Sequence, residues 1–167
     1  MGAASRRDCD LAGNSTKIRG SKSLRKGRVS IKGEPYLITS TIHEREDLLN
    51  DAQSSGIVAG ALHWLHENNR IDLIAYVIMP DHLHLIATLK TGTLPEIMHS
   101  LKSYTSKKIN KTLKREGGVW QEQYHDHAIR KEEDLKEVIH YCLNNPVRKK
   151  LVKSYQDYPY WYCKWEV

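Results

Sequence analysis

Two histidines stand two residues apart in VIMPDHLHLIATL, residues 77–89, a segment that is otherwise mostly apolar. In a β-strand, neighbouring side chains point to opposite faces, so His82 and His84 would share one face and the leucines beside them the other. Two neutral imidazoles held this close form a ready pair of metal ligands, and Asp81 could hold one of them. We therefore predict a metal site here, with an exposed polar strand edge as the alternative.

A second pair of histidines has the same spacing: His125 and His127 flank Asp126. The charged residue between them would leave their strand without a well-buried face. We therefore rank this pair below the first as the metal site.

Tyr104 could supply a nucleophile beside such a metal. An apolar stripe at helical spacing runs through residues 94–101, and Tyr104 extends it. A tyrosine on such a stripe usually belongs to the core, but residues 102–115 hold six cations and no acid, which suits phosphate and favours an ionised phenol. We predict phosphoryl transfer in which a metal polarises the phosphate and Tyr104 attacks it. The six cations are Lys102, Lys107, Lys108, Lys111, Lys114 and Arg115.

Periodicity predicts the elements that must position these residues. The order is β-α-β-β-α-β followed by one more helix, which predicts an α+β fold: a ferredoxin-like antiparallel sheet with helices on one face plus a C-terminal helix. Thr93 and Glu96 fit a capping box for the second helix, and Gly117 and Gly118 are expected to stop it. The predicted strands are 35–42, 71–79, 82–89 and 120–130, and the predicted helices are 47–69, 93–118 and 131–146.

The basic excess lies in an N-terminal arm. Residues 1–33 hold nine basic and two acidic residues, giving +7, whereas the remaining 17 basic and 18 acidic residues give −1. This segment is rich in Gly and Ser, so we expect a flexible arm ahead of one domain at 34–167. Nucleic acid would suit such an arm, and a solvated tail is the alternative.

Membrane-spanning and secreted classes do not fit the sequence. No apolar run approaches the roughly 18 residues of a membrane span, and the N-terminus lacks the apolar core of a secretory signal. The three cysteines are far apart and odd in number, which suits neither a disulfide framework nor a zinc knuckle. We expect a cytoplasmic protein with reduced thiols and no membrane partner.

Several motifs together resemble one enzyme family. MPDHLHL resembles the HUH motif (His, bulky apolar, His) of single-tyrosine transposases of the insertion-sequence type. SLKSYTSKKIN, VWQEQYHDHAIR and YCLNNPVRKKLV resemble the branch called REP-associated tyrosine transposases, over residues 34–161. The resemblance implies a bacterial, nucleoid-associated enzyme with Mg²⁺ or Mn²⁺. It also implies cleavage and rejoining of single-stranded DNA, often near a hairpin, through a tyrosine joined to the 5′ phosphate.

Carried over to this chain, the resemblance makes His82 and His84 metal ligands and Tyr104 the nucleophile. It also implies a third ligand one turn past the tyrosine, usually Gln, Asn, His or Glu. That position is Lys108, and a protonated lysine cannot bind a metal. Asp126 and His127 are candidates to support the site. The candidate DNA contacts are Lys102, Lys107, Lys108, Lys111, Arg130 and Arg148.

Two other functions stay open. A catalytically weak module that binds structured single-stranded nucleic acid is favoured by Lys108. A zinc hydrolase or RNA enzyme using the same histidines ranks last, because no carboxylate has a clear general-base position. The protein could be a monomer or a homodimer. Tryptophans could stack on unpaired bases, although we expect Trp64 and Trp120 to be packing residues.

Overall fold

The computed structural model describes residues 29–130 and 134–166. Its strands pair into one antiparallel sheet in the order β4-β1-β3-β2-β5. The strands are β1 (Pro35–Ile42), β2 (Ile71–Met79), β3 (His82–Leu89), β4 (Trp120–Ala128) and β5 (Trp161–Cys163). The helices are α1 (Ala52–Glu67), α2 (Leu94–Leu113), α3 (Leu135–Leu143) and α4 (Asn145–Arg148), with short 3₁₀ turns at His43–Arg45 and Tyr155–Asp157.

Most of the predicted architecture is confirmed. Strands β1, β2 and β3 have the predicted bounds, and Pro80 and Asp81 join β2 to β3 as a hairpin. The capping box of α2 is present: the backbone N–H of Glu96 donates to the Thr93 hydroxyl, and the N–H of Thr93 donates to the Glu96 carboxylate. The α+β, ferredoxin-like order is likewise confirmed.

The ends of the first two helices differ from the prediction for local reasons. Helix α1 begins at Ala52, because the Asp51 carboxylate accepts the backbone N–H groups of Gln53 and Ser54. Helix α2 ends before the predicted glycines, because Lys114 adopts a left-handed conformation with φ 51°.

The C-terminal region contains more structure than the sequence predicted. The predicted helix at 131–146 ends as α3 at Leu143, and Pro146 lies in the first turn of the separate helix α4. Strand β5 pairs with β2 at the edge of the sheet and was not predicted, because three residues are too few to show a period.

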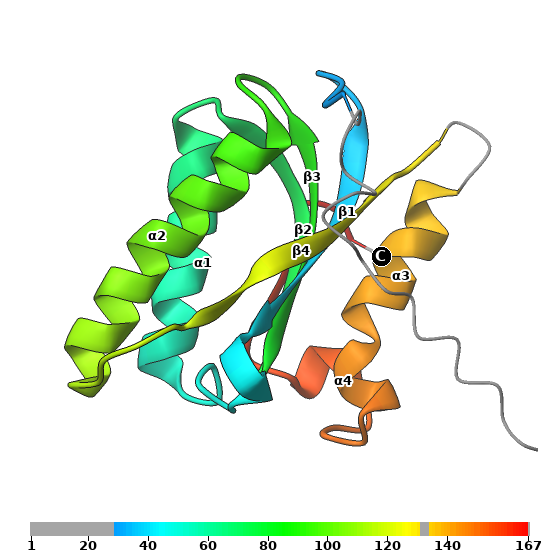
Figure 1. Cartoon of the computed structure of the whole chain (residues 1–167). Coiled ribbons are helices and arrows are strands. Elements are labelled where there is room, and N and C mark those ends of the chain that lie inside the picture. The colour runs from blue at the N-terminus through cyan, green and yellow to red at the C-terminus, as the bar shows by residue number, and fades with distance from the viewer. Residues whose placement is uncertain (1–28, 131–133, 167) are drawn as a thin grey trace, which may run out of the picture.

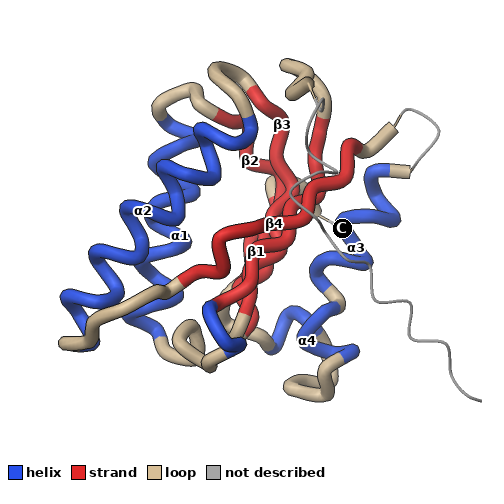
Figure 2. Tube along the Cα trace, in the orientation of Figure 1, coloured by secondary structure: helices blue, strands red, loops and turns tan. Residues whose placement is uncertain are grey.

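The sheet separates two cores (Figure 1). Helices α1 and α2 pack on one face, and α3 and α4 on the other, as Figure 2 also shows. Leu83 and Leu85 belong to the core beneath α1 and α2. Ile86 lies two residues past His84, on the same face of β3, and belongs to the core beneath α3. The alternation of β3 therefore directs His82 and His84 toward α3 and α4.

Three further predictions have different outcomes. The basic arm lies almost wholly outside the described residues. In its described part, the Ser30 hydroxyl accepts the backbone N–H of Leu94 at the start of α2. Trp120 is buried as expected, whereas Trp64 is not: 52% of it is exposed. Among the described residues, no helix is both long and apolar enough to cross a membrane.

Candidate active site

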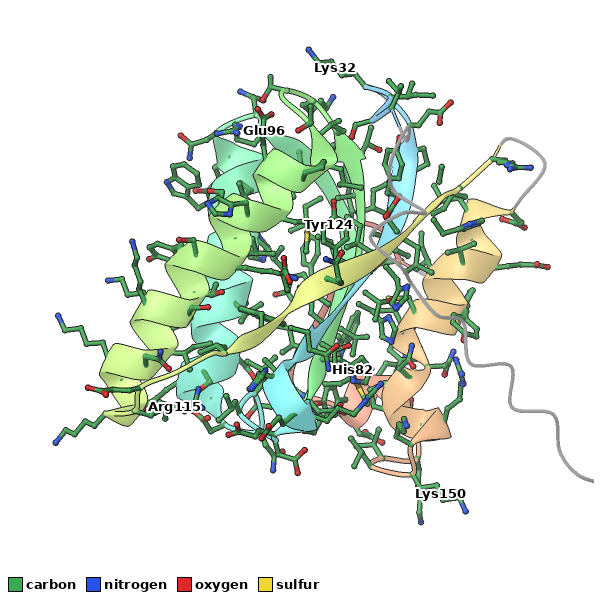
Figure 3. All side chains as sticks on the ribbon, viewed as in Figure 1. Lys32, His82, Glu96, Arg115, Tyr124 and Lys150 are labelled. Atoms are coloured by element: carbon green, nitrogen blue, oxygen red, sulfur yellow. The ribbon has the colours of Figure 1, made fainter. Side chains whose placement is uncertain are left out.

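The two histidines of β3 face each other across a short distance. Their Nε2 atoms lie 3.1 Å apart, and the ring planes are nearly perpendicular, at 89°. His82 is buried, and it lies at the end of β3 nearest α4 (Figure 3). Both Nε2 atoms therefore converge on one point, which is the arrangement that a shared metal ligand set requires.

Each imidazole ring makes a hydrogen bond through its Nδ1 atom. His82 Nδ1 bonds to the Asp81 carboxylate, which also accepts an Arg45 N–H at 2.9 Å, and His84 Nδ1 lies 2.9 Å from the Thr39 hydroxyl. A carboxylate can only accept, so His82 carries its proton on Nδ1 and its Nε2 is an acceptor. The 3.1 Å contact then needs a proton on His84 Nε2, and Thr39 donates to His84 Nδ1. With this assignment, each hydrogen bond in the series from Asp81 through the two histidines to Thr39 has one donor and one acceptor.

Burial keeps both imidazoles neutral. Desolvation, together with the neighbouring His82 and the charge of Arg148, lowers the pKa of His84 to about 3. Desolvation also lowers the pKa of His82, although Asp81 opposes the change. Burial raises the pKa of Asp81, but the hydrogen bonds from His82 and Arg45 outweigh it and leave that pKa below its ordinary value. Neutral imidazoles beside an ionised carboxylate are in the protonation state that metal binding needs.

Asn145 closes the site from the first turn of α4. It is 6% exposed, and its side-chain nitrogen donates to the carbonyl oxygens of Tyr141 and Cys142 at 3.3 and 2.9 Å. Both N–H groups are thus turned toward α3, and the amide side chain lies beside His84, whose pKa it raises in opposition to burial. The amide oxygen is the atom left to act as a ligand beside the two imidazoles.

Tyr141 stands on the last turn of α3, four residues before Asn145. Although α3 ends at Leu143 and Asn145 begins α4, the two residues are neighbours, because the Asn145 side chain donates to the Tyr141 carbonyl oxygen. The side chain is 54% exposed, and the guanidinium of Arg148 lies 4.2 Å from its ring centroid. The charge of Arg148 also acts on His84. Arg148 thus links the exposed phenol of Tyr141 to the histidine pair on this face of the sheet.

Tyr104 lies on the opposite face of the sheet. Its neighbours Leu101 and Ile97 pack in the core beneath α1 and α2, and Tyr104 itself lines a groove between those helices. The whole sheet separates it from His82 and His84. The prediction that Tyr104 could reach a metal at these histidines is therefore wrong.

Comparison with known proteins identifies the family. The model of the family described as "Transposase IS200 like" matches residues 34–145, which is more than half of the chain. The chain belongs to the IS200-like transposase family. The matched region contains the histidine pair, Tyr141 and Asn145.

Related proteins carry a more specific name. A REP-associated tyrosine transposase of Haemophilus influenzae is 28% identical over 77% of this chain and 79% of that protein. A REP-associated tyrosine transposase of Escherichia coli strain K12 is 27% identical over 80% of this chain and 78% of that protein.

Solved structures agree with this assignment. A structure of the REP-associated tyrosine transposase bound to a REP hairpin aligns with a TM-score of 0.66 and 26% identity, covering 80% of this chain and 79% of that chain. A transposase from Deinococcus radiodurans aligns with a TM-score of 0.50 and 19% identity, over 71% of this chain and 95% of that one, and supports the fold alone.

Tyr141 is followed at one-turn spacing by an asparagine, whereas Tyr104 is followed there by Lys108. The resemblance implied a ligand such as Asn one turn past the tyrosine, and Asn145 stands one turn past Tyr141. Applying the same rule to every helical tyrosine would have found this pair. Among the described residues no group of three His, Cys, Asp or Glu could hold a metal.

Most of the lysines predicted to bind DNA lie far from this site. The Lys102 ammonium donates to the carbonyl oxygens of Gln121, Glu122 and Gln123 in β4 at 2.8 to 3.3 Å, which ties α2 to the sheet. The other predicted lysines, Lys107, Lys108 and Lys111, are exposed on α2. Of the predicted DNA contacts, Arg148 is the one that the structure places at the histidine pair.

The residues around the second histidine pair divide between the faces. By the pairing of β4 with β1, Asp126 lies on the α2 side, where it lines a shallow cavity together with Arg130. His125 is exposed on the other face and pairs with Thr39, so one strand separates it from His84. The expected supporting roles of Asp126 and His127, and the DNA contact of Arg130, stay predictions.

Proposed function

We propose that this transposase cleaves and rejoins single-stranded DNA beside a hairpin, with Tyr141 as the nucleophile. The observation that carries the proposal is the grouping of Tyr141 and Asn145 with the histidine pair on one face of the sheet. The related structure with a REP hairpin supports hairpin DNA as the substrate.

His82, His84 and Asn145 would hold the metal. Their two imidazole nitrogens and one amide oxygen suit a divalent cation that keeps places for water and phosphate oxygens, and we propose Mg²⁺ or Mn²⁺. When bound, such an ion polarises a phosphoryl oxygen and offsets developing negative charge. To offer both Nε2 atoms, His84 moves its proton to Nδ1, which then donates to the Thr39 hydroxyl.

The chain's own residues perform the transfer. The Tyr141 oxygen attacks phosphorus, and the bond from phosphorus to the 3′ oxygen breaks. The phenol releases its proton to the solvent that reaches this exposed side chain, and the departing 3′ oxygen takes up a proton. Arg148, stacked on the phenol ring, is placed to contact the phosphate. The 5′ phosphate stays on Tyr141 until a 3′ hydroxyl attacks it, so rejoining needs no nucleotide cofactor.

With Tyr141 as the nucleophile, the sequence feature that favoured a weak binding module no longer applies. That alternative depended on Lys108 following the nucleophile by one turn, but Lys108 lies on α2, on the other face of the sheet. A protein that binds the hairpin but forms no adduct with any metal would restore this alternative.

Matched tyrosine variants test the proposal. A labelled hairpin oligonucleotide with a single-stranded flank is incubated with Mn²⁺, and covalent adducts are resolved on a denaturing gel. Wild type and Tyr104→Phe should form the adduct, whereas Tyr141→Phe should not. An adduct that persists in Tyr141→Phe would overturn the assignment.

Asparagine variants test the third ligand. Asn145→Ala should weaken Mn²⁺ binding and slow adduct formation, whereas the neighbouring Asn144→Ala, whose amide donates to the His140 carbonyl oxygen, should change neither. Equal effects of the two changes, measured by calorimetry and by the gel assay, would contradict the role of Asn145.

A further inference from the structure

A groove lies between α1 and α2, on the face of the sheet away from the histidine pair. Its volume is about 520 Å³, and Trp64 and Tyr104 line it. These two side chains are 52% and 51% exposed, so neither is a buried core residue. A large aromatic surface therefore faces solvent outside the catalytic site.

Gly60 lines this groove. A Cβ at Gly60 would meet no atom within 4 Å, so packing does not require glycine there. Glycine inside a helix costs about 0.5 to 1 kcal/mol relative to alanine. Helix α1 therefore carries this cost without a packing reason.

The electrostatics of this surface favour a polyanion. No acidic residue occurs between residues 52 and 66 or between residues 97 and 115. Lys107, Lys108 and Lys111 follow Tyr104 by three, four and seven residues, so they form one exposed stripe with it on α2. The Lys108 ammonium lies 5.8 Å from the Tyr104 ring centroid. Aromatic faces beside a row of cations are the elements of a surface that binds single strands.

We infer that the α1–α2 groove is a second DNA site, in which Trp64 and Tyr104 stack on unpaired bases while the lysine stripe follows the phosphates. The inference rests in part on the proposed function, because it assigns this site to the same class of substrate. It adds a contact that the sheet separates from the cleavage chemistry, for a part of the strand away from the cleaved bond.

A second copy of the chain fits this surface less well. Two copies docked groove to groove would bring two lysine stripes together, with no acidic residue on either helix segment to pair with them. Single-stranded DNA instead meets the cations with phosphates and the rings with bases.

Binding without metal tests the site separately from catalysis. Fluorescence anisotropy in EDTA measures the affinity for a labelled thymidine oligonucleotide of about 12 nucleotides, a length within the usual 4 to 16 for one single-strand site. Trp64→Ala and Tyr104→Ala should each weaken binding by about 5- to 150-fold, as expected for one lost stacked base. Trp64→Phe should recover part of the loss. Lys108→Gln should lower the salt slope by about 0.7.

Trp165→Ala is the matched control, because Trp165 is 47% exposed and lies by α3, outside the groove. It should bind as the wild type does, and thermal melts should show that all variants are folded. Alanine variants in the groove that bind as tightly as the wild type would overturn the inference. Self-association of the wild type that Trp64→Ala abolishes, seen by sedimentation, would also overturn it.

The outcome is separable from the proposed function. Loss of binding in Trp64→Ala supports the groove even if no adduct forms on Tyr141. An adduct on Tyr141 together with unchanged binding by the groove variants removes this inference alone.

Discussion

Acid should destabilise the metal-free protein through His84. Burial lowers the pKa of His84 from 6.5 to about 3, so between these values the unfolded chain binds a proton that the folded chain does not. Stability contributed by the neutral ring is thus present above pH 6.5 and is lost as the pH falls. At pH 5 the loss in the free energy of unfolding is about 2 kcal/mol. It depends mainly on the pKa of His84 in the unfolded chain, because the folded ring is still neutral at this pH.

Urea denaturation in EDTA at pH 7 and pH 5 measures the contribution of His84 to the pH dependence of stability. The free energy of unfolding of the wild type should fall more than that of His84→Gln, by about 2 kcal/mol, since glutamine does not titrate. His99→Gln removes an exposed histidine of α2 instead and should keep the wild-type loss. If the wild type and His84→Gln lose the same free energy, the neutral buried ring is refuted.

The low pKa of His84 should also make its contribution to metal affinity insensitive to mild acid. A free imidazole of pKa 6.5 would lose about 30-fold in affinity at pH 5, because a proton has to leave first. His84 is already deprotonated in the folded protein. Its share of Mn²⁺ binding, measured by calorimetry, should therefore change little between pH 7 and pH 5, and a 30-fold loss assigned to His84 would contradict this.

Two further substitutions and one chemical labelling experiment test other contacts. Asp81→Asn should weaken Mn²⁺ binding by about 10- to 100-fold, because the His82 ring loses its carboxylate partner, and unchanged calorimetry would contradict that role. Thr105→Val should cost about 1 to 3 kcal/mol in urea denaturation, because it leaves the buried Trp120 N–H without its acceptor, and Thr105→Ser should not. Burial raises the pKa of Cys142 to about 12, so iodoacetamide at pH 8 should leave that thiol unmodified in the folded protein by mass spectrometry.

The strands and the first two helices could be predicted because each carries a clear period or cap. The alternation of Pro35–Ile42 gave the bounds of β1, and the capping box gave the start of α2. The C-terminal region could not be predicted in the same way. Pro146 suggested a stop, although proline also suits the first turn of a new helix, and β5 depends on a distant pairing with β2.

The pairing of His82 and His84 on one face of β3 could be predicted, and the choice of Tyr104 followed from ignoring the faces of the sheet. Crossover connections in this fold are right-handed, so α1 and α2 cover the same face. The leucines of β3 must point to those helices, and His82 and His84 therefore point away from both. A tyrosine on α2 cannot satisfy that geometry. The cations around Tyr104 lie on the face away from the histidine pair, and phosphate as their partner stays a prediction.

Strand register links the stability of this fold to its chemistry. His84 lies opposite Thr39 of β1 and Val77 of β2, so its hydrogen bond and its apolar surroundings depend on both pairings. A slip of one residue would move Leu83 to the catalytic face and both imidazoles into the core beneath α1 and α2. The slipped strand would then bury polar rings without Asp81 or Thr39, at a cost of several kcal/mol. The alternation of leucine and histidine thus selects the register and, through it, the face that the histidine pair shares with Asn145 and Tyr141.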